Sequence, residues 1–179
     1  DYIIHIVPTA TATPTDTPTA TPTDTPTVTP TSTPTTQFTG HVIWQGRPAQ
    51  PNARQVLPIS LTLIGTNTYN FPGTTDASGN FTVNVDSVPN CTYTWRVKGP
   101  QYLSSSGSVV LSHAPNTTVE MGVQRAGDAN NDNLVDVTDF GILHVTFATY
   151  NDPRADFNGD LIVDITDFGL LVGNFGQLG

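Results

Sequence analysis

The middle of the chain, from about residue 37 to 124, alternates apolar and polar positions in short runs. The run from Tyr93 to Val97, which reads Tyr-Thr-Trp-Arg-Val, is a clear example. A period of two places alternate side chains on one face of a β-strand. Turn residues such as those from Asp76 to Gly79 separate the runs. The pattern predicts six strands and hence an all-β sandwich: Phe38–Trp44, Ile59–Leu63, Asn80–Val85, Thr92–Gly99, Gly107–Leu111 and Thr117–Val123.

The last third of the chain changes to a helical period. Phe140, Leu143 and Phe147 recur at spacings of three and four, and a second stretch that begins at Phe168 repeats the same spacings. Such spacing favours one apolar face on each of two short helices. Each helical stretch directly follows a segment rich in Asp and Asn, so we expect two loop–helix units.

The N-terminal segment, residues 1–36, has two other patterns. Residues 1–7 read DYIIHIV, the composition of a strand buried on both faces. The alternatives are a stray hydrophobic terminus or the first strand of a separate domain. Residues 8–36 carry a Thr-Pro repeat with proline at every fourth position from Pro14 to Pro34. Proline removes a backbone donor and restricts the residue before it, so we expect an extended, polyproline-II-like spacer. The same composition is typical of O-glycosylated stalks, with a bare flexible linker as the alternative.

These patterns divide the chain into four segments. They are an apolar strand (1–7), a Thr/Pro spacer (8–36), a β-sandwich (37–124) and a loop–helix domain (125–179). The expected fold class is therefore multidomain: an Ig-like or prealbumin-like all-β sandwich followed by a small α-helical domain, with an extended spacer before them.

Composition and charge exclude several classes of function. The net charge is −9 and Lys98 is the only lysine, which argues against nucleic-acid binding because that needs clustered basic residues. The single cysteine, Cys91, rules out a disulfide within one chain. No apolar run approaches the roughly 20 residues of a membrane span. The chain begins at Asp1 without methionine, so we expect a processed or truncated form.

The acidic residues concentrate in the two loops of a repeat. The segment GDANNDNLVDVTDFGILHVTF aligns without gaps with ADFNGDLIVDITDFGLLVGNF, so that Asp128 falls on Asp156. A calcium ion takes six to eight oxygen ligands, and a twelve-residue loop supplies them from positions 1, 3, 5, 7, 9 and 12, with a backbone carbonyl at position 7. The spacing therefore predicts two calcium ions. Their expected ligands are Asp128, Asn130, Asp132, Leu134, Asp136 and Asp139 in the first loop and Asp156, Asn158, Asp160, Ile162, Asp164 and Asp167 in the second.

Two further features of the loops follow from this alignment. Val135 and Val163, at position 8, are expected to turn inward and join the two loops by a short β contact. Position 6, which needs a positive φ and is normally glycine, holds Asn133 in the first loop and Leu161 in the second. Leucine in that conformation costs roughly 1–2 kcal/mol. We expect the second site to bind calcium more weakly or to have a distorted turn.

The duplicated loop–helix unit resembles the type I dockerin. It differs from an ordinary EF-hand because Asp stands at position 12 and the residues before the first loop, Arg125 to Gly127, do not read as a helix. The resemblance runs from about Gly127 to Gln177. It implies a secreted or cell-surface location and a cohesin-like protein partner. It further implies partner contacts through Val137 and Thr138 and through Ile165 and Thr166, so that either helix could face the same partner. The alternative is that Val137 and Ile165 pack inside the molecule.

The sandwich segment also has a family resemblance. The runs TTDASGNFTVNV and TYTWRVKG resemble the carboxypeptidase regulatory-like, prealbumin-like sandwich family, and the likeness covers most of residues 37–124. That likeness implies a structural spacer without catalytic residues. The four histidines are scattered over different segments, and the paired carboxylates are already assigned to calcium. We therefore expect a non-enzymatic assembly protein.

A second function is compatible with the same chain. The apolar residues of the first segment could complete the sheet of a neighbouring copy, and repetition of that contact would build a filament. The donor strand would consist of Tyr2, Ile3, Ile4, Ile6 and Val7.

Overall fold

The computed structural model describes residues 1–3, 5, 9, 35–112 and 114–179. The chain divides into two units, Asp1–Ser32 and Thr33–Gly179. In the first unit, the side chains of Tyr2 and Ile3 are 99% and 88% exposed. The remaining donor-strand positions, Ile4, Ile6 and Val7, and nearly all of the Thr/Pro spacer lie outside the described residues.

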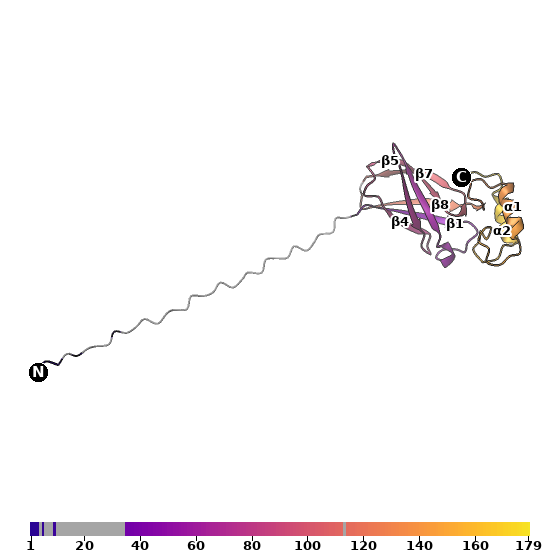
Figure 1. Ribbon diagram of the computed structural model, residues 1–179. Coiled ribbons are helices and arrows are strands. Elements are labelled where there is room, and N and C mark those ends of the chain that lie inside the picture. Colours follow the sequence, from indigo (N-terminus) through magenta and orange to yellow (C-terminus); the bar gives the residue numbers. More distant parts are fainter. Residues whose placement is uncertain (4, 6–8, 10–34, 113) are drawn as a thin grey trace. The chain divides into compact units, whose positions relative to one another are not determined.

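The second unit contains a β-sandwich made of two sheets (Figure 1). The first sheet has the order β4 (Asn80–Asn84), β1 (Gln37–Trp44), β8 (Asn116–Gln124), and the second has the order β3 (Thr68–Thr74), β2 (Pro58–Ile64), β5 (Cys91–Lys98), β7 (Ser105–Leu111). β1 and β8 are parallel, and every other neighbouring pair in these two sheets is antiparallel. All six strands expected from the sequence are present, so the sandwich is confirmed.

Strand β3 was not expected from the sequence. It forms an edge of the second sheet, and its side chains alternate between exposed and half-buried. Pro72 and Gly73 interrupt its strand pattern, and an edge strand tolerates proline because one row of its backbone groups has no ladder partner. β2 and β3 form a hairpin. The turn from Asp76 to Gly79 then connects β3 to β4, which lies in the other sheet.

The core lies between the inner faces of the two sheets. In β2, Leu61 and Leu63 are fully buried, whereas Ser60 is exposed, as the alternation predicts. The ring of Trp44 packs on Tyr102 with their centroids 4.7 Å apart. This pair lies at the end of the sandwich that meets the loop–helix repeat, because Tyr102 also contacts the second loop.

A separate two-stranded sheet links the sandwich to the repeat. β6 (Gln101–Tyr102) pairs with β9 (Ala126–Asp128), and the register places Gln101 opposite Asp128. A short 3-10 helix, η1 (Ala53–Gln55), lies between β1 and β2 in the sequence. Because β9 ends on the first acidic residue of the repeat, the sandwich directly positions the start of the first loop.

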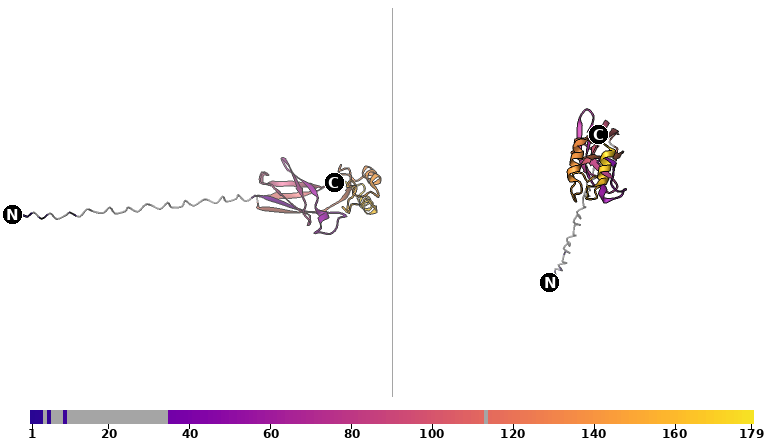
Figure 2. Two further views of the ribbon diagram at one scale, coloured as in Figure 1. Left: turned by 60° about the horizontal axis from the view of Figure 1, so that its bottom comes forward. Right: turned by 90° about the vertical axis from the view of Figure 1, so that its right-hand side faces the viewer.

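Two helices follow the loops: α1 (Val137–Thr146) and α2 (Ile165–Gly173). They lie side by side, as Figure 2 shows, and the rings of Phe140 and Phe168 meet with their centroids 6.2 Å apart. In each loop, the aspartate at position 9 is the N-cap of the following helix. Each helix therefore begins at position 10, before the expected end of the loop at position 12. Among the described residues, no helix has the length and apolar character needed to cross a membrane.

Candidate metal centre and helix face

The two loops are joined crosswise to the segments that follow the helices. Val135 and Val163 are completely buried, as expected. However, they do not pair with each other. Val135 exchanges backbone hydrogen bonds with Gly176 and Gln177, after α2, and Val163 does so with Ala148 and Thr149, after α1. The expected β contact between the loops is therefore wrong.

These backbone bonds place the two helices antiparallel. The end of α2 returns to the start of α1, and the end of α1 lies at the start of α2. Two isolated bridges, Leu134 with Leu178 and Tyr150 with Ile162, repeat the same arrangement in the two halves of the repeat. Each loop is thus completed by the segment after the other helix.

The aspartate at position 12 of each loop is fully buried and held by backbone amides. In the first loop, Asp139 accepts hydrogen bonds from the amides of Asn130 at 3.1 Å and Asp136 at 2.8 Å. In the second, Asp167 accepts from Phe157 at 2.8 Å and Asp164 at 3.0 Å. Burial raises the pKa of both carboxyl groups above the usual aspartate value and outweighs the opposing effect of these hydrogen bonds. The fold therefore holds two carboxyl groups in places where a bare negative charge is costly.

The aspartate at position 9 caps the helix that follows. The side chain of Asp136 accepts from the amide of Thr138, and that of Asp164 accepts from Thr166, each at 2.7 Å. With Asp139 and Asp167 reaching back to the cap residue, both helices start in a complete capping box. In each half of the repeat, the aspartates at positions 9 and 12 thus belong both to the loop and to the start of the helix.

Asp128, at position 1 of the first loop, has a buried oxygen without a partner. The residue is 0% exposed, and its Oδ1 makes no hydrogen bond with any residue that the structure describes. Its other oxygen, Oδ2, accepts from the amide of Asn133 at 3.0 Å and from Lys98 Nζ at 2.7 Å. A buried, unpartnered carboxylate oxygen is costly unless a cation contacts it. This observation fits a metal ion in the first loop.

In the second loop, backbone amides hold both oxygens of Asp156. Oδ1 accepts from Gly159 at 2.8 Å and from Asp160 at 3.1 Å, and Oδ2 accepts from Leu161 at 2.9 Å. A carboxylate oxygen has two lone pairs, so Oδ2, which accepts one amide bond, can bind a cation as well. The two loops therefore have the same backbone path but different partners at position 1.

The asparagine and aspartate side chains at positions 3 and 5 shape both loops alike. Asn130 Oδ1 accepts from the amide of Asp132 at 2.9 Å, and Asn158 Oδ1 accepts from Asp160 at 2.7 Å. No cluster of three or more His, Cys, Asp or Glu side chains with metal-holding geometry occurs in the described part of the chain. A calcium loop, however, takes part of its ligands from asparagine and from a backbone carbonyl. The assignment of the twelve expected ligands remains a prediction.

Position 6 has the same backbone in both loops. Asn133 and Leu161 both have a φ of 75°, the left-handed conformation that the loop alignment requires. The second turn therefore follows the path of the first, and its leucine adopts a conformation that a branched apolar side chain disfavours. A weaker second calcium site remains a prediction.

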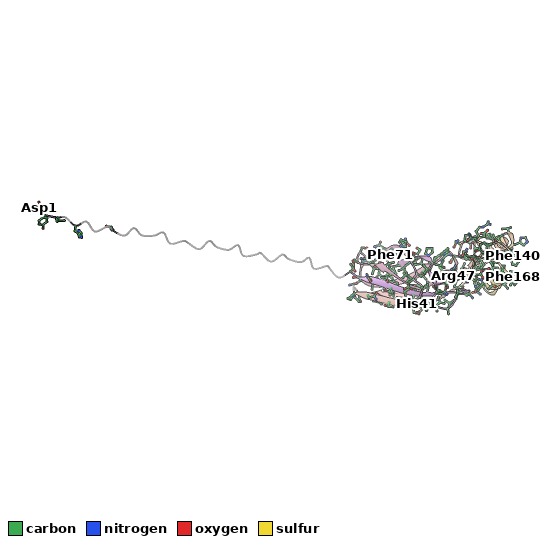
Figure 3. All side chains as sticks on the ribbon, turned by 90° about the horizontal axis from the view of Figure 1, so that it is seen from below. Asp1, His41, Arg47, Phe71, Phe140 and Phe168 are labelled. Atoms are coloured by element: carbon green, nitrogen blue, oxygen red, sulfur yellow. The ribbon has the colours of Figure 1, made fainter. Side chains whose placement is uncertain are left out.

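The expected partner-binding residues lie on an exposed apolar face. Val137 and Ile165 are 69% and 68% exposed, and the adjacent threonines, Thr138 and Thr166, are also exposed. Figure 3 shows Phe140 and Phe168 together at the end of the second unit opposite Phe71. Val137 and Ile165 therefore do not pack into the core that Leu143 and Leu171 join.

A pocket of about 410 Å³ opens on this face. Its lining comes from both helices and the residue that ends α1: Phe140, Leu143, His144, Phe147, Ile165 and Phe168. Most of these lining residues are aromatic or aliphatic and have an aromatic or aliphatic residue at the equivalent position of the other half of the repeat. The exception is His144, whose equivalent residue is Val172. The face is thus nearly, but not fully, symmetric.

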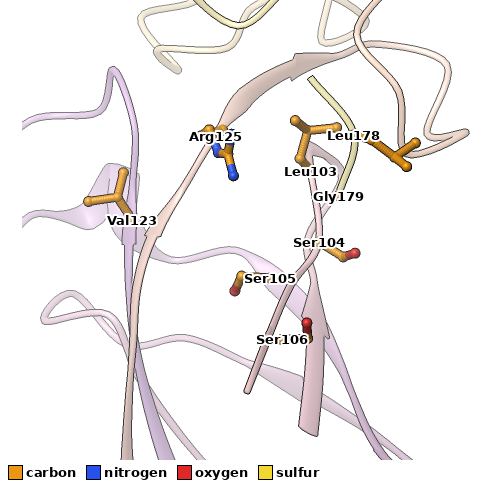
Figure 4. A pocket seen from close by; sticks show the side chains of 8 residues that line it. All are labelled: Leu103, Ser104, Ser105, Ser106, Val123, Arg125, Leu178 and Gly179. Carbon is orange, nitrogen blue, oxygen red and sulfur yellow. The ribbon is translucent and has the colours of Figure 1, made fainter. Parts of the chain in front are cut away.

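The C-terminal segment closes the junction between the sandwich and the first loop. Figure 4 shows Leu178 and Gly179 beside Leu103 and Ser104. Asn133 Oδ1 accepts from the amide of Ser104 at 2.7 Å, and the amide of Gly179 donates to the Asn133 carbonyl at 3.0 Å. Asn133 therefore ties the first loop both to the sandwich and to the end of the chain.

Other sandwich residues hold the second loop and α2. Tyr102 donates from its hydroxyl to the Phe157 carbonyl at 2.7 Å, and Gln45 Oε1 accepts from the side chain of Asn174, the C-cap of α2, at 2.6 Å. Tyr102 was not expected at the site, because no local pattern reveals a contact between residues so far apart in the sequence.

Comparison with solved structures supports the fold. Chains from two crystal structures of the type II cohesin–X-dockerin complex of Acetivibrio cellulolyticus, one a C-terminal and one an N-terminal interface mutant, are 20% and 19% identical, with TM-scores of 0.62 and 0.63. Each match covers 80% of this chain and 97% of the other. A match of that length cannot be supplied by residues 1–124 alone, so the matched fold extends beyond the sandwich into the loop–helix repeat.

Other comparisons assign no family. A DUF3823 family protein from Bacteroides ovatus ATCC 8483 matches 52% of this chain at 15% identity, with a TM-score of 0.35. No family model matches the sequence, and no curated protein matches it. The comparisons thus support a β-sandwich with two short helices.

Proposed function

We propose that the protein is a non-catalytic, extracellular assembly module that docks a protein partner through its calcium-ordered helix pair. The observation that carries this proposal is a pair of acidic loops, each with a buried aspartate at position 12 and an aspartate at position 9 that caps the following helix. They place α1 and α2 side by side with Val137 and Ile165 exposed. In this account the sandwich is a rigid platform for the repeat.

Calcium would act by stabilising the loops. When bound, the ion neutralises the carboxylates that the loop brings together and satisfies Asp128 Oδ1. The loop residues in turn hold the helix starts, since Asp136 and Asp164 are both loop members and N-caps. Removal of calcium should therefore loosen both helices and the face they form.

A cohesin-like partner fits this face best. The matched structures are of cohesin–X-dockerin complexes, and the loop–helix repeat of this chain resembles a type I dockerin. The exposed face combines aliphatic and aromatic side chains with threonine hydroxyl groups. Such a mixture suits a protein surface better than a charged polymer, because apolar anchors supply most of the binding energy at a protein interface.

The docking proposal is tested with purified cohesin modules of types I and II. Calorimetry should show binding of the full chain to at least one module in calcium, and loss of binding in excess chelator. The double substitution Val137→Asp and Ile165→Asp should abolish binding without changing calcium uptake. The matched control is Val110→Asp, because Val110 is similarly exposed, at 63%, but lies on the sandwich. Docking that persists in chelator, or no docking to any module, would contradict the proposal.

A second candidate, a filament subunit, is favoured by one observation. Tyr2 and Ile3, both large and apolar, are almost fully exposed in the first unit. Strands β3, β4, β7 and β8 are the edges of the two sandwich sheets and offer positions where a strand from a neighbouring copy could pair. In that account the Thr/Pro spacer, with or without O-linked glycans, separates neighbouring copies.

Electron microscopy distinguishes the two candidates. Filaments formed by the full chain and lost on deletion of residues 1–7 would support donor-strand assembly. Single particles under all calcium conditions, or filaments that survive the deletion, would remove it.

A further inference from the structure

Lys98 extends from the end of β5 in the sandwich into the first loop of the repeat. Its Nζ donates to Asp128 Oδ2 at 2.7 Å and to Asn131 Oδ1 at 3.3 Å. On the sandwich side it donates to the carbonyl oxygens of Gly99 and Tyr102. The ammonium group is therefore fixed from both sides, with 25% of the lysine side chain exposed and none of Asp128 exposed.

Among the described residues, no cation forms an ion pair with Asp156, the corresponding aspartate of the second loop. Both oxygens of Asp156 accept from backbone amides. The nearby guanidinium of Arg47 donates to the Tyr102 hydroxyl and the Arg54 carbonyl. This guanidinium lies against Gly159 of the second loop, but among the described residues it forms no ion pair with a loop acid, whereas Lys98 pairs directly with Asp128. The two loops, alike in sequence, thus differ in whether a cation from the sandwich bonds to the aspartate at position 1.

We propose that Lys98 is a built-in part of the first calcium site, a fixed cation that supports the empty loop and lowers the affinity of that loop for calcium. This inference rests on the proposed function, since it presupposes that the loops bind calcium. Lys98 lies outside the loop motif, so the expected calcium ligands do not include it.

The geometry shows why Lys98 does not simply replace the ion. The ammonium group binds Oδ2 of Asp128 and leaves Oδ1 without a partner. A calcium ion at Oδ1 and the ammonium group at Oδ2 would share one carboxylate. The two cations would then repel each other across it, and their separation is well within a Debye length of about 8–10 Å.

The sign of the effect follows from linkage. Lys98 interacts with an acidic loop when calcium is absent and with a neutralised loop when calcium is bound. Its attraction is therefore stronger in the empty state. A residue that stabilises the empty state more than the bound state lowers the affinity for the ligand.

The test compares three variants of the full chain. Lys98→Met removes the charge, and Lys98→Arg keeps it. Arg96→Met is the matched control, because Arg96 lies on the same strand and donates to Ser104 Oγ instead of a loop acid. Calcium affinity is measured by calorimetry at low salt, and the melting temperature in chelator is measured in parallel. The first-loop affinity is identified by repeating the titration with Asp156→Ala, which weakens the second loop.

The proposal gives distinct expectations for each variant. Lys98→Met should bind calcium at the first loop about three- to tenfold more tightly, melt at a lower temperature in chelator, and lose most of its affinity gain in ~0.5 M salt. Lys98→Arg and Arg96→Met should keep the first-loop affinity of the unmodified chain. An unchanged or weaker first-loop affinity in Lys98→Met would overturn the inference. If the unmodified chain takes up no calcium, the proposed function itself fails, and the two failures are thereby distinguished.

Discussion

At the scale of single residues, the two loops show how one backbone path accommodates different side chains. Asn133 and Leu161 occupy the same left-handed position, but Asn133 also accepts a hydrogen bond from Ser104. Leu161 is 46% exposed, so little burial offsets the strain of its backbone. The two residues therefore contribute very differently to stability at equivalent positions.

We expect Leu161→Asn to stabilise the protein by up to about 1 kcal/mol, because asparagine tolerates a positive φ that leucine disfavours. The reverse substitution in the first loop, Asn133→Leu, should cost more than this, since it adds strain and removes the bond to Ser104. Urea unfolding in calcium measures both changes. If both substitutions change the stability by the same small amount, the positive φ of Leu161 does not destabilise the second loop.

A second residue-scale prediction concerns His41, which lies between Glu120 and Gln50 on the sandwich. Burial lowers the pKa of His41, but its hydrogen bonds to Gln50 and Glu120 and the charge of Glu120 outweigh burial and raise the pKa above its usual value. The resulting stabilisation is complete below the unfolded pKa of about 6.5 and is lost as the pH rises through the folded pKa.

Stability should therefore decrease as the pH is raised through neutrality, and Glu120→Gln should flatten this dependence. Thermal unfolding from about pH 5.5 to 8.5 measures it, with Asp152→Asn as a control for the loss of another carboxylate. A pH profile that Glu120→Gln leaves unchanged would exclude His41 as its source.

At the scale of elements, each helix is defined at its start by its own loop and at its end by contacts with the other loop. The crosswise pairing means that the segment after α2 completes the first loop. It also means that the helix pair and both loops form one structure instead of two independent repeats. In both halves of the sequence repeat, the loop thus pairs with the segment that follows the helix of the other half.

Removal of residues 176–179 should weaken calcium binding to the first loop more than to the second. The truncation deletes the backbone partners of Val135 and the Gly179 bond to Asn133, but leaves the partners of Val163. Calorimetry of the truncated chain measures the two affinities. Equal losses at both loops would contradict the crosswise arrangement as the basis of loop stability.

Several elements could be predicted from the sequence because their signals are local. Alternation in β2 and β5 and the aspartate spacing in both loops each lie within a short stretch of chain. The loop spacing predicts helix starts that are too late, because Asp136 and Asp164 are helix N-caps as well as expected calcium ligands. β3 was missed because Pro72 and Gly73 resemble a turn, although an edge position tolerates them.

At the scale of the whole second unit, the sandwich and the repeat share one junction. Lys98, Tyr102 and the pair of Asn174 with Gln45 connect them through bonds between residues far apart in the sequence. No periodic pattern marks such contacts, so the sequence alone predicted two neighbouring domains without their junction.

Tyr102→Phe should test the strength of this junction. Burial raises the pKa of Tyr102 to about 12, despite the opposing influence of Arg47, so its hydroxyl stays protonated and can donate to Phe157. Loss of the hydroxyl leaves the Phe157 carbonyl without this donor, and we expect a loss of about 1–3 kcal/mol in the free energy of unfolding. Tyr69→Phe, on edge strand β3, is the control. Equal stability of the two variants would show that the junction does not depend on this bond.

In the proposed function, the two acidic loops bind calcium and thereby order the helix pair. Native mass spectrometry of the full chain, joined with far-ultraviolet circular dichroism during a calcium titration, tests it most directly. We expect one calcium ion per loop and a gain of helical signal that saturates as the ions bind, with one ion lost in Asp139→Ala. A chain that takes up no calcium, and whose helical signal is the same in calcium and in chelator, would contradict it.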